Sequence, residues 1–220
     1  MSYFGVPVIR NIVNISQVMA KYARQWTFSS VTVPISLEAY FSPCQTLPHQ
    51  SNADFSALRH QATNRYIYSI FTLSPLFNLP HNFELFLNLR TQLSSQNLIS
   101  TEQFGLGGFY SVRGYDENEI YRDNAILTNI ELRLPSFNFI KRLKNRLQFL
   151  LFLDTGMGWD VHPAPNVKNL QYLIGTGPGL RYNLSNYLVF RFDCGFKLHR
   201  TEFDQNENVQ KIHFGLVGSF

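Results

Sequence analysis

Hydrophobic and polar residues alternate with a period of two along most of this chain from Trp26 onward. In the clearest run, residues 83–90, the apolar positions are Phe83, Leu85, Leu87 and Leu89. Because successive side chains of a β-strand point to opposite faces, this pattern predicts a strand with one apolar and one polar face. Similar alternation recurs at 31–41, 66–73, 126–134, 147–159, 172–182, 188–198 and 211–220.

The predicted strands are long, and their charges fall on one face. Most of these roughly eight strands span about 9–13 residues, whereas soluble strands usually have about 5–6 and tilted membrane strands need about 9–11. The charges on the polar face are Glu84, Arg90, Glu131, Arg133, Asp154, Arg181, Arg191, Asp193 and Lys197. An antiparallel barrel with lipid outside and water inside accommodates them, whereas a dry core does not. A soluble lipocalin-like barrel would show the same alternation, and strand length favours the membrane barrel.

Residues 1–25 clearly follow neither the strand period of two residues nor the helix period of about 3.6 residues. Ile12, Val13, Ile15 and Val18 fit a helix face or an irregular strand, so both remain open. This segment also lacks the basic start and apolar stretch of a signal peptide. By itself that predicts a cytosolic protein; with a membrane barrel it predicts a missing front end. We therefore divide the chain into an unassigned leading segment, 1–25, and a barrel segment, 26–220, with a long connection at about 96–123.

Composition excludes several classes of protein. Of the 220 residues, 45% are hydrophobic and 15% aromatic, yet no window approaches the roughly 18 consecutive apolar residues of a membrane-spanning helix. The net charge of +4 is mild and scattered, which speaks against a nucleic-acid partner. The one basic cluster, residues 141–146, predicts a solvated turn.

Candidate chemistry for an enzyme is weak. Cys44 and Cys194 are far apart, and the six histidines show no ligand spacing, so we expect no disulfide, metal or cofactor. The stretch Gly175–Gly179 resembles a nucleotide loop, but no helix follows and Pro178 breaks the pattern. There is no Gly-x-Ser-x-Gly elbow, so we expect no catalysis.

The long connection contains the most distinctive stretch, Phe104–Tyr115, with sequence FGLGGFYSVRGY. Gly107 and Gly108 allow close approach of backbone, and Gly114 permits a sharp turn beside Arg113. The guanidinium of Arg113 is suited to bidentate binding of a carboxylate. A solvated surface loop would contain the same residue types, and the strands on either side favour an inward loop.

This stretch, together with Asn129–Pro135, Phe152–Gly156 and the terminal Phe220, resembles the outer-membrane superfamily of protein translocases and insertases. Within it the chain is most similar to the two-partner secretion transporters, the haemolysin secretion/activation proteins. The resemblance covers residue 26 to the end. It implies a sixteen-stranded transmembrane β-barrel, of which this chain would form the C-terminal half.

The resemblance also implies a site. In the family, the loop containing Val112, Arg113, Gly114 and Tyr115 folds back into the barrel, and its arginine pairs with the aspartate of the Phe-x-Asp-x-Gly strand. This motif corresponds here to Phe152, Asp154 and Gly156, with Glu131 on the neighbouring strand. Independently, alternation places Asp154 and Glu131 on the polar faces of consecutive strands. Inward glycines on the following strands leave space for a loop, or alternatively allow curvature.

The chain departs from the family pattern in its length and at its last strand. It lacks the family's signal peptide, periplasmic domains and about half of the strands. The expected C-terminal assembly signal is Phe214, Leu216 and Phe220, with Gly218 where an aromatic residue is usual. The partners implied are the outer-membrane lipid bilayer, the barrel-assembly machinery and a secreted polypeptide.

Three functions remain open on this basis. The first is an outer-membrane translocation pore that exports a partner polypeptide, with the loop arginine locked to a lumen carboxylate. The second is an insertase that assembles other outer-membrane proteins through a lateral seam. The third is a soluble ligand-binding β-barrel.

Overall fold

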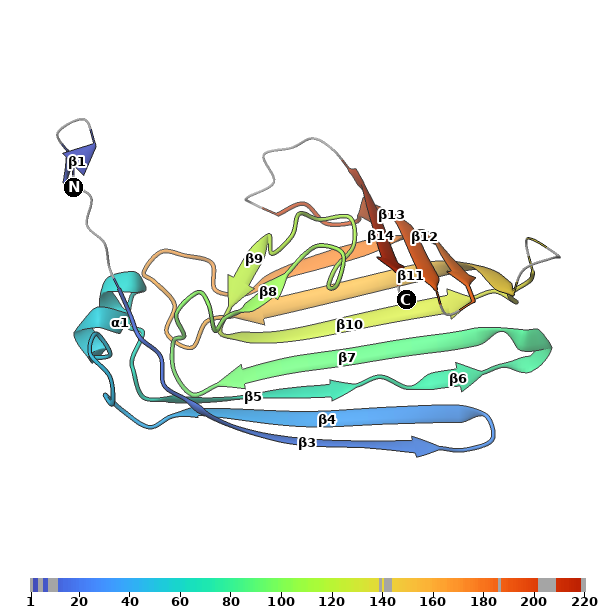
Figure 1. The fold of residues 1–220 in the computed structure, drawn as a ribbon. Helices are drawn as coiled ribbons and strands as arrows, with labels where there is room; N and C mark the ends of the chain where they lie inside the picture. Colours follow the sequence, from blue (N-terminus) through green and yellow to red (C-terminus); the bar gives the residue numbers. More distant parts are fainter. Residues whose placement is uncertain are drawn as a thin grey trace.

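The structure, a computed structural model, describes residues 2–3, 6–7, 12–138, 140, 144–185, 187–201 and 209–218. In this part the chain is mostly antiparallel β-sheet with one short α-helix (Figure 1). The long strands are β3 (Val18–Thr27), β4 (Val31–Ser42), β5 (Tyr66–Leu73), β7 (Glu84–Ser94), β10 (Asn124–Arg133), β11 (Asn145–Trp159), β12 (Gln171–Leu184), β13 (Leu188–Lys197) and β14 (Gln210–Gly218). The short elements are β1 (Ser2–Tyr3), β2 (Val6–Pro7), α1 (Asn52–Leu58), β6 (Leu76–Asn78), a 3-10 turn (Pro80–Asn82), β8 (Phe104–Leu106) and β9 (Ile120–Arg122).

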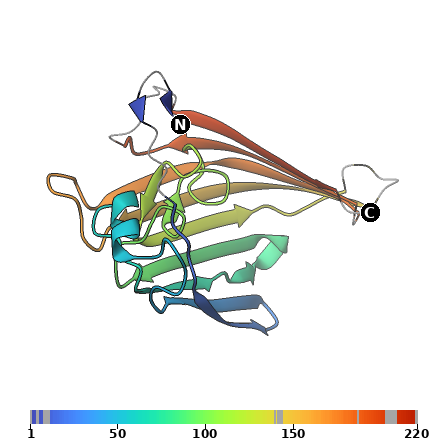
Figure 2. The ribbon, with the colours of Figure 1, turned by 60° about the vertical axis from the view of Figure 1, so that its left-hand side comes forward.

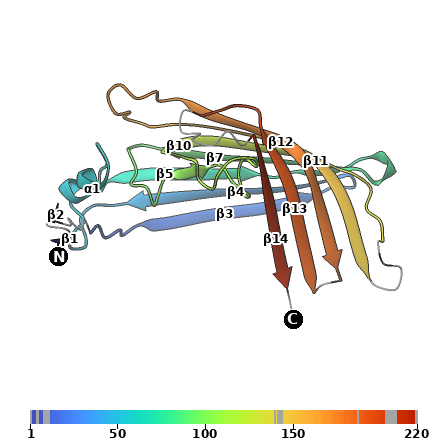
Figure 3. The same ribbon diagram turned by 90° about the horizontal axis from the view of Figure 1, so that it is seen from above.

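The long strands form one sheet in the order β14-β13-β12-β11-β10-β7-β5-β4-β3, with β6 paired to β4 and β7. Neighbouring strands are antiparallel throughout. The sheet is strongly curved: β11 to β14 run steeply across the direction of β3 to β5 (Figure 3), and the segment containing β8 and β9 lies on the concave side (Figures 1 and 2).

Successive connections lie at opposite ends of the antiparallel sheet. One end has the connections 28–30, 134–144 and 185–187, with residues 79–83 closing the β6–β7 hairpin. The other end has 43–65, 95–123, 160–170 and 198–209, which include the two longest. A barrel with its longer loops at one end is typical of the outer membrane. The longest connection, between β7 and β10, turns back over the sheet.

The polarity of the sheet follows the sequence pattern. On β11 the outward side chains of Phe149, Leu151 and Leu153 are 45%, 57% and 39% exposed, while the inward Phe152 and Asp154 are 3% and 0% exposed. A soluble lipocalin-like barrel would have the opposite arrangement. The expected antiparallel β-sheet, with an apolar outer face and a charged inner face, is confirmed.

Two local differences from the sequence prediction have physical causes. The leading segment left open between helix and strand contains β3, which pairs with β4 along its length, so the sheet has nine long strands and not about eight. Sequence alternation also missed α1, which begins at a capping box: the Ser51 hydroxyl accepts from Asp54 N, and the Asp54 carboxylate accepts from Ser51 N at 2.8 Å. No helix in the described part of the chain has the length and apolar character needed to span a membrane.

Candidate functional site

A short hairpin and backbone turns at glycines shape the motif in the long connection. β8 and β9 pair with each other, and the stretch between them carries the glycines. Gly107, Gly108 and Gly114 have φ values of 107°, 99° and 102°, a region that disfavours side chains. At Gly107 an added Cβ would also lie 2.5 Å from the Asp116 carbonyl oxygen. The chain therefore needs glycine here to turn twice within a few residues.

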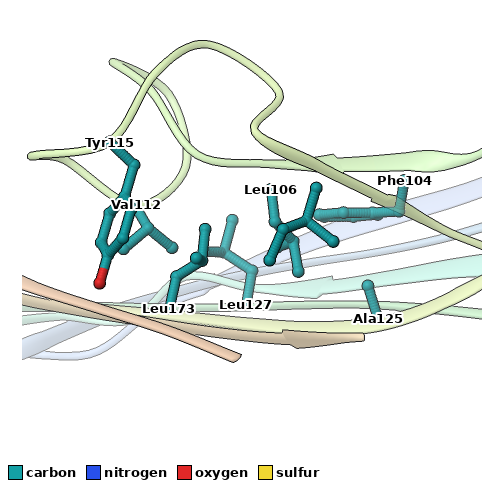
Figure 4. Packing of buried hydrophobic residues seen from close by; sticks show 8 residues of the cluster. Phe104, Leu106, Val112, Tyr115, Ala125, Leu127 and Leu173 are labelled. Atoms are coloured by element: carbon teal, nitrogen blue, oxygen red, sulfur yellow. The ribbon is translucent and has the colours of Figure 1, made fainter. Parts of the chain in front are cut away.

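The underside of the loop is apolar and packs on the inner wall of the sheet (Figure 4). Leu106, Val112 and Tyr115, each 0% exposed, point toward Leu127 of β10 and Leu173 of β12. Burial of this kind contributes roughly 1.5–3 kcal/mol for each large side chain. The loop is therefore held to the wall by a hydrophobic contact as well as by charge.

Arg113 lies at the centre of the contact between loop and wall. It is 2% exposed, and its Nε and Nη2 donate to the two carboxylate oxygens of Asp154 at 2.7 and 2.8 Å. Its backbone N–H donates to the same carboxylate at 3.0 Å. Its Nη1 donates to Glu131 Oε1 at 2.7 Å and lies 3.6 Å from Asp193 Oδ1. The guanidinium stacks 3.6 Å from the ring centroid of Phe152, which covers it from solvent.

The carboxylates around Arg113 are shared with arginines of the wall. Arg181 donates to Asp193 at 2.7 Å and to Glu131 at 3.3 Å. Arg191 donates to Asp193 at 2.7 Å, and Arg133 donates to Glu131 at 2.7 Å. Each of these two carboxylates therefore faces three guanidiniums, one of which belongs to the loop.

Electrostatics keep Arg113 charged in the docked loop. Burial by itself would lower the pKa of its guanidinium, but hydrogen bonding and charge from Asp154, together with Glu131 and Asp193, raise the pKa above its ordinary value. Asn129 completes the contact, since its Nδ2 donates to Asp154 Oδ1 at 2.8 Å and to the Ser111 carbonyl oxygen at 2.7 Å. Strand register accounts for this arrangement, because Asp154 pairs with Asn129 on one side and with Gly175 on the other.

Glycines of the wall let the loop backbone approach the sheet. A Cβ at Gly175 would lie 2.0 Å from the Arg113 carbonyl oxygen, and one at Gly195 would lie 2.4 Å from the Gly114 nitrogen. A Cβ at Gly156 would meet the loop side chains of Leu106 and Val112 at 2.9 Å. The inward glycines therefore form the floor on which the loop lies.

Beyond Arg113 the loop is fastened to the last two strands. Gly114 N donates to His213 Nε2 on β14 at 3.2 Å, and Asp116 pairs with Lys211 on the same strand. Phe109 lies beneath Arg191, whose guanidinium carbon is 4.1 Å from the ring centroid. The loop thus spans the wall from β10 to β14.

Tyr115 bridges the loop and the outgoing end of β13. Its hydroxyl lies 3.0 Å from the carbonyl oxygen of Ile174 and 2.5 Å from that of His199, and it accepts from Ile174 N at 3.1 Å. Tyr115→Phe removes the hydroxyl contacts to His199 O and Ile174 N, whereas the Ile174 carbonyl oxygen still accepts from Leu198 N; the loss costs roughly 1 kcal/mol locally. We expect amide hydrogen exchange in 112–116 to rise about tenfold, with the exposed Tyr110→Phe unchanged as control. Unaltered exchange in Tyr115→Phe would contradict this role.

A cavity of about 340 Å³ lies beside the docked arginine. Arg133, Arg181 and Arg191 line it together with Phe109 and Tyr110. The Tyr110 ring is 82% exposed. Guanidinium groups and aromatic rings on a wet wall can make weak, exchangeable contacts with an extended peptide.

The structure brings together the loop residues and wall residues that the sequence singled out: Gly107, Gly108, Val112, Arg113, Gly114, Tyr115, Glu131, Phe152, Asp154 and Gly156. It places the expected assembly signal elsewhere, with Phe214 and Leu216 on the outer face at 75% and 64% exposure. Phe220 lies outside the described residues.

Sequence reasoning did not connect the last strands to the loop. Asp193, Arg181 and Arg191 were expected to face inward, but nothing in their spacing identified Arg113 or its carboxylates as partners. The alternation of residues 211–220 gave His213 no role, and Asn129 was part of a motif without a contact. Among the described residues Cys44 and Cys194 are free thiols, and no group of three or more metal-binding side chains occurs.

An apolar exterior, a charged concave face and an infolded loop define part of an outer-membrane β-barrel. The family model for the haemolysin secretion/activation proteins ShlB/FhaC/HecB matches residues 20–182, and the chain belongs to this family. Proteins of this family are outer-membrane transporters and not enzymes, so the expected family and localisation are confirmed.

Solved structures show the same fold. CdiB from Escherichia coli has a TM-score of 0.69 and 16% identity, with 90% of this chain and 35% of that chain covered. CdiB from Acinetobacter baumannii has a TM-score of 0.62 and 19% identity, with 91% and 32% covered. The chain therefore spans about a third of the length of these structures. A comparison with curated protein sequences gives no match.

Proposed function

We propose that this chain forms part of an outer-membrane pore that exports a partner polypeptide, as in two-partner secretion, and that the Arg113 loop controls its lumen. The partner would be an unfolded secreted chain that passes along the charged inner face. Family membership supports the class of transporter. The ion pairs of Arg113 support the assignment of the loop as the controlling element.

The observation that carries the proposal is the near-complete burial of one loop arginine among carboxylates from three wall strands. Asp154, Glu131 and Asp193 come from β11, β10 and β13, and each lies within 3.6 Å of the Arg113 guanidinium. Two opposite charges 4 Å apart interact by about 4 kcal/mol at an intermediate dielectric, before the cost of removing them from water. Such a contact holds a loop in one place.

The same contact allows the loop to be released. The wall carboxylates have other partners, since Arg181 and Arg191 remain bound to Asp193 when Arg113 leaves. Asp154 keeps Asn129, and water in the lumen can solvate its other oxygen. The wall therefore stays satisfied with the loop displaced, as a movable gate requires.

The outer surface of the sheet is suited to the two other proposed partners, the lipid bilayer and the barrel-assembly machinery. The outward apolar side chains of β11 to β14 would contact the lipid bilayer, and Phe214 and Leu216 with the terminal Phe220 would be read by the barrel-assembly machinery. The leading segment 1–25 and the barrel segment 26–220 remain the proposed division, although β3 begins before residue 26 and already belongs to the sheet.

The test is a comparison of proteins in the culture medium with and without the gene that encodes this chain. We expect one large polypeptide to disappear from the medium when the gene is deleted and to return on complementation. An unchanged medium would contradict the proposal. A general loss of other outer-membrane barrels would instead identify an insertase.

A further inference from the structure

A second charged cluster lies at the base of the long loop, away from the Arg113 site. Arg59, which directly follows α1, donates through Nη1 to Asp123 Oδ1 at 2.5 Å and through Nη2 to Asp123 Oδ2 at 3.1 Å. Its Nη1 also donates to the carbonyl oxygen of Leu98 at 2.5 Å. Its Nη2 lies 2.9 Å from Asp160 Oδ1. One guanidinium therefore joins its own connection, 43–65, to two others, 95–123 and 160–170.

Asp123 is the shared acceptor of this cluster. Its side chain is 0% exposed, and it accepts from the backbone N–H groups of Leu98 at 2.9 Å and Val161 at 3.2 Å. Gln103 Nε2 adds a third donor at 3.4 Å. A buried carboxylate needs such compensation, and removal of its arginine leaves the charge partly unbalanced.

Asn97 joins the same connections through backbone groups. Its Nδ2 donates to the carbonyl oxygens of His60 at 3.0 Å and His162 at 2.8 Å. Its Oδ1 accepts from His162 N at 2.8 Å, and its side chain is buried. The connections 43–65, 95–123 and 160–170 are thus tied together at one end of the sheet.

A separate apolar cluster supports this base. It consists of Phe55, Ala62, Tyr66, Tyr68, Leu98 and Ile99, with no member in common with the cluster beneath the arginine loop. The base therefore has its own packed core. It does not depend on the contact between the loop tip and the wall.

The two residues that Arg59 joins within the long connection are its outgoing and returning ends. Leu98 lies just after β7, and Asp123 lies between β9 and β10. The pairing of Gln92 with Ala125 already closes this connection at the sheet. Arg59 adds a second closure between Leu98 and Asp123, so the tip of the loop explores fewer positions than it would without this contact. The direction in which the loop enters the lumen is then set at its base.

We propose that Arg59 is a positioning residue: it clamps the two ends of the long connection to each other and to the β11–β12 connection, and so directs Arg113 onto Asp154. The proposal rests on the docked loop of the proposed function but does not require export. It predicts that the loop loosens when the contacts of Arg59 are removed, although none of the partners of Arg59 belongs to the Arg113 site.

The test measures the reactivity of a cysteine at Val112, which is 0% exposed beneath the loop. Outer membranes carrying Val112→Cys, with Cys44 and Cys194 replaced by serine, are treated with a maleimide. We expect Arg59→Ala to raise the labelling rate about tenfold, because the docked state loses stability. Arg59→Lys keeps the positive charge but lacks the planar guanidinium that binds both oxygens of Asp123, and we expect an intermediate labelling rate.

Controls separate positioning from general unfolding. Labelling of Leu150→Cys, buried on β11 and outside the loop contact, should not change in Arg59→Ala. The exposed Arg65→Ala in the same connection should also have no effect on Val112→Cys. If Arg59→Ala fails to assemble, Asp160→Asn removes one partner of Arg59 and should raise labelling about threefold.

An unchanged rate at Val112→Cys, or an equal rise at Leu150→Cys, would overturn the proposal. The assay is independent of export. A secretion assay in which Arg113→Ala exports normally would contradict the proposed function and leave the clamp standing.

Discussion

Arg113→Ala is expected to reduce export of the partner polypeptide by about tenfold or more, while the barrel still assembles in the outer membrane. The substitution leaves Asp154, 0% exposed, without its bidentate partner and leaves Glu131 with one guanidinium fewer. Breaking a buried pair costs about 3–5 kcal/mol. The docked loop is the state that this contact stabilises, so the loss falls on the loop and not on the strands.

The measurement is the amount of partner polypeptide in the medium, with heat-modifiable migration of the barrel as the check on assembly. Arg113→Lys is the matched control. A lysine keeps the positive charge but cannot bind both oxygens of Asp154 and reach Glu131 at once, so we expect partial export. Export at the level of the unmodified protein by Arg113→Ala would refute the arginine lock.

The second large effect is expected at the floor of the loop. Gly175→Val should reduce export about as strongly as Arg113→Ala, because its Cβ would lie 2.0 Å from the Arg113 carbonyl oxygen and only the loop can move away. Valine is favoured in strands, so β12 itself should form normally. The change therefore displaces the loop without altering any charge.

Gly218→Val is the control for Gly175→Val, since the nearest atom to an added Cβ there is 3.9 Å away. The double variant with Arg113→Ala should export no less than either single variant, because both changes undock the same loop. An additive loss would mean that Gly175 and Arg113 act independently. Normal export by Gly175→Val would show that the loop need not lie on this wall.

The long strands and their polarity were predictable because alternation is a local property of the chain. In the middle of β11, from Phe149 to Asp154, the period alone assigns the outward and inward residues, whereas Leu147 on the outward side is buried. The sequence prediction was incomplete at two places, and both have local causes. Residues 18–27 lack a clean period, and β3 forms because its backbone pairs with β4. The helix α1 is only seven residues long, and its capping box lies within a stretch that otherwise predicts a loop.

The site was predictable only in part. The motif residues Arg113 and Asp154 could be paired by resemblance, and the alternation placed Glu131 on the same inner face. Distances between strands that are not neighbours depend on register and curvature, which no sequence pattern contains. The contacts of Arg113 with Asp193 on β13, and of Gly114 with His213 on β14, therefore required the folded chain.

By itself the sequence determined which face of each long strand is apolar, where most of the turns lie, and which loop carries an arginine suited to binding a carboxylate. These are properties of neighbouring residues. The tertiary structure alone decided that Arg113 is shared among three strands, and that Arg59 holds the two ends of its loop together. Both depend on residues tens of positions apart meeting at one point, which the curvature of the sheet and the path of the loop bring about.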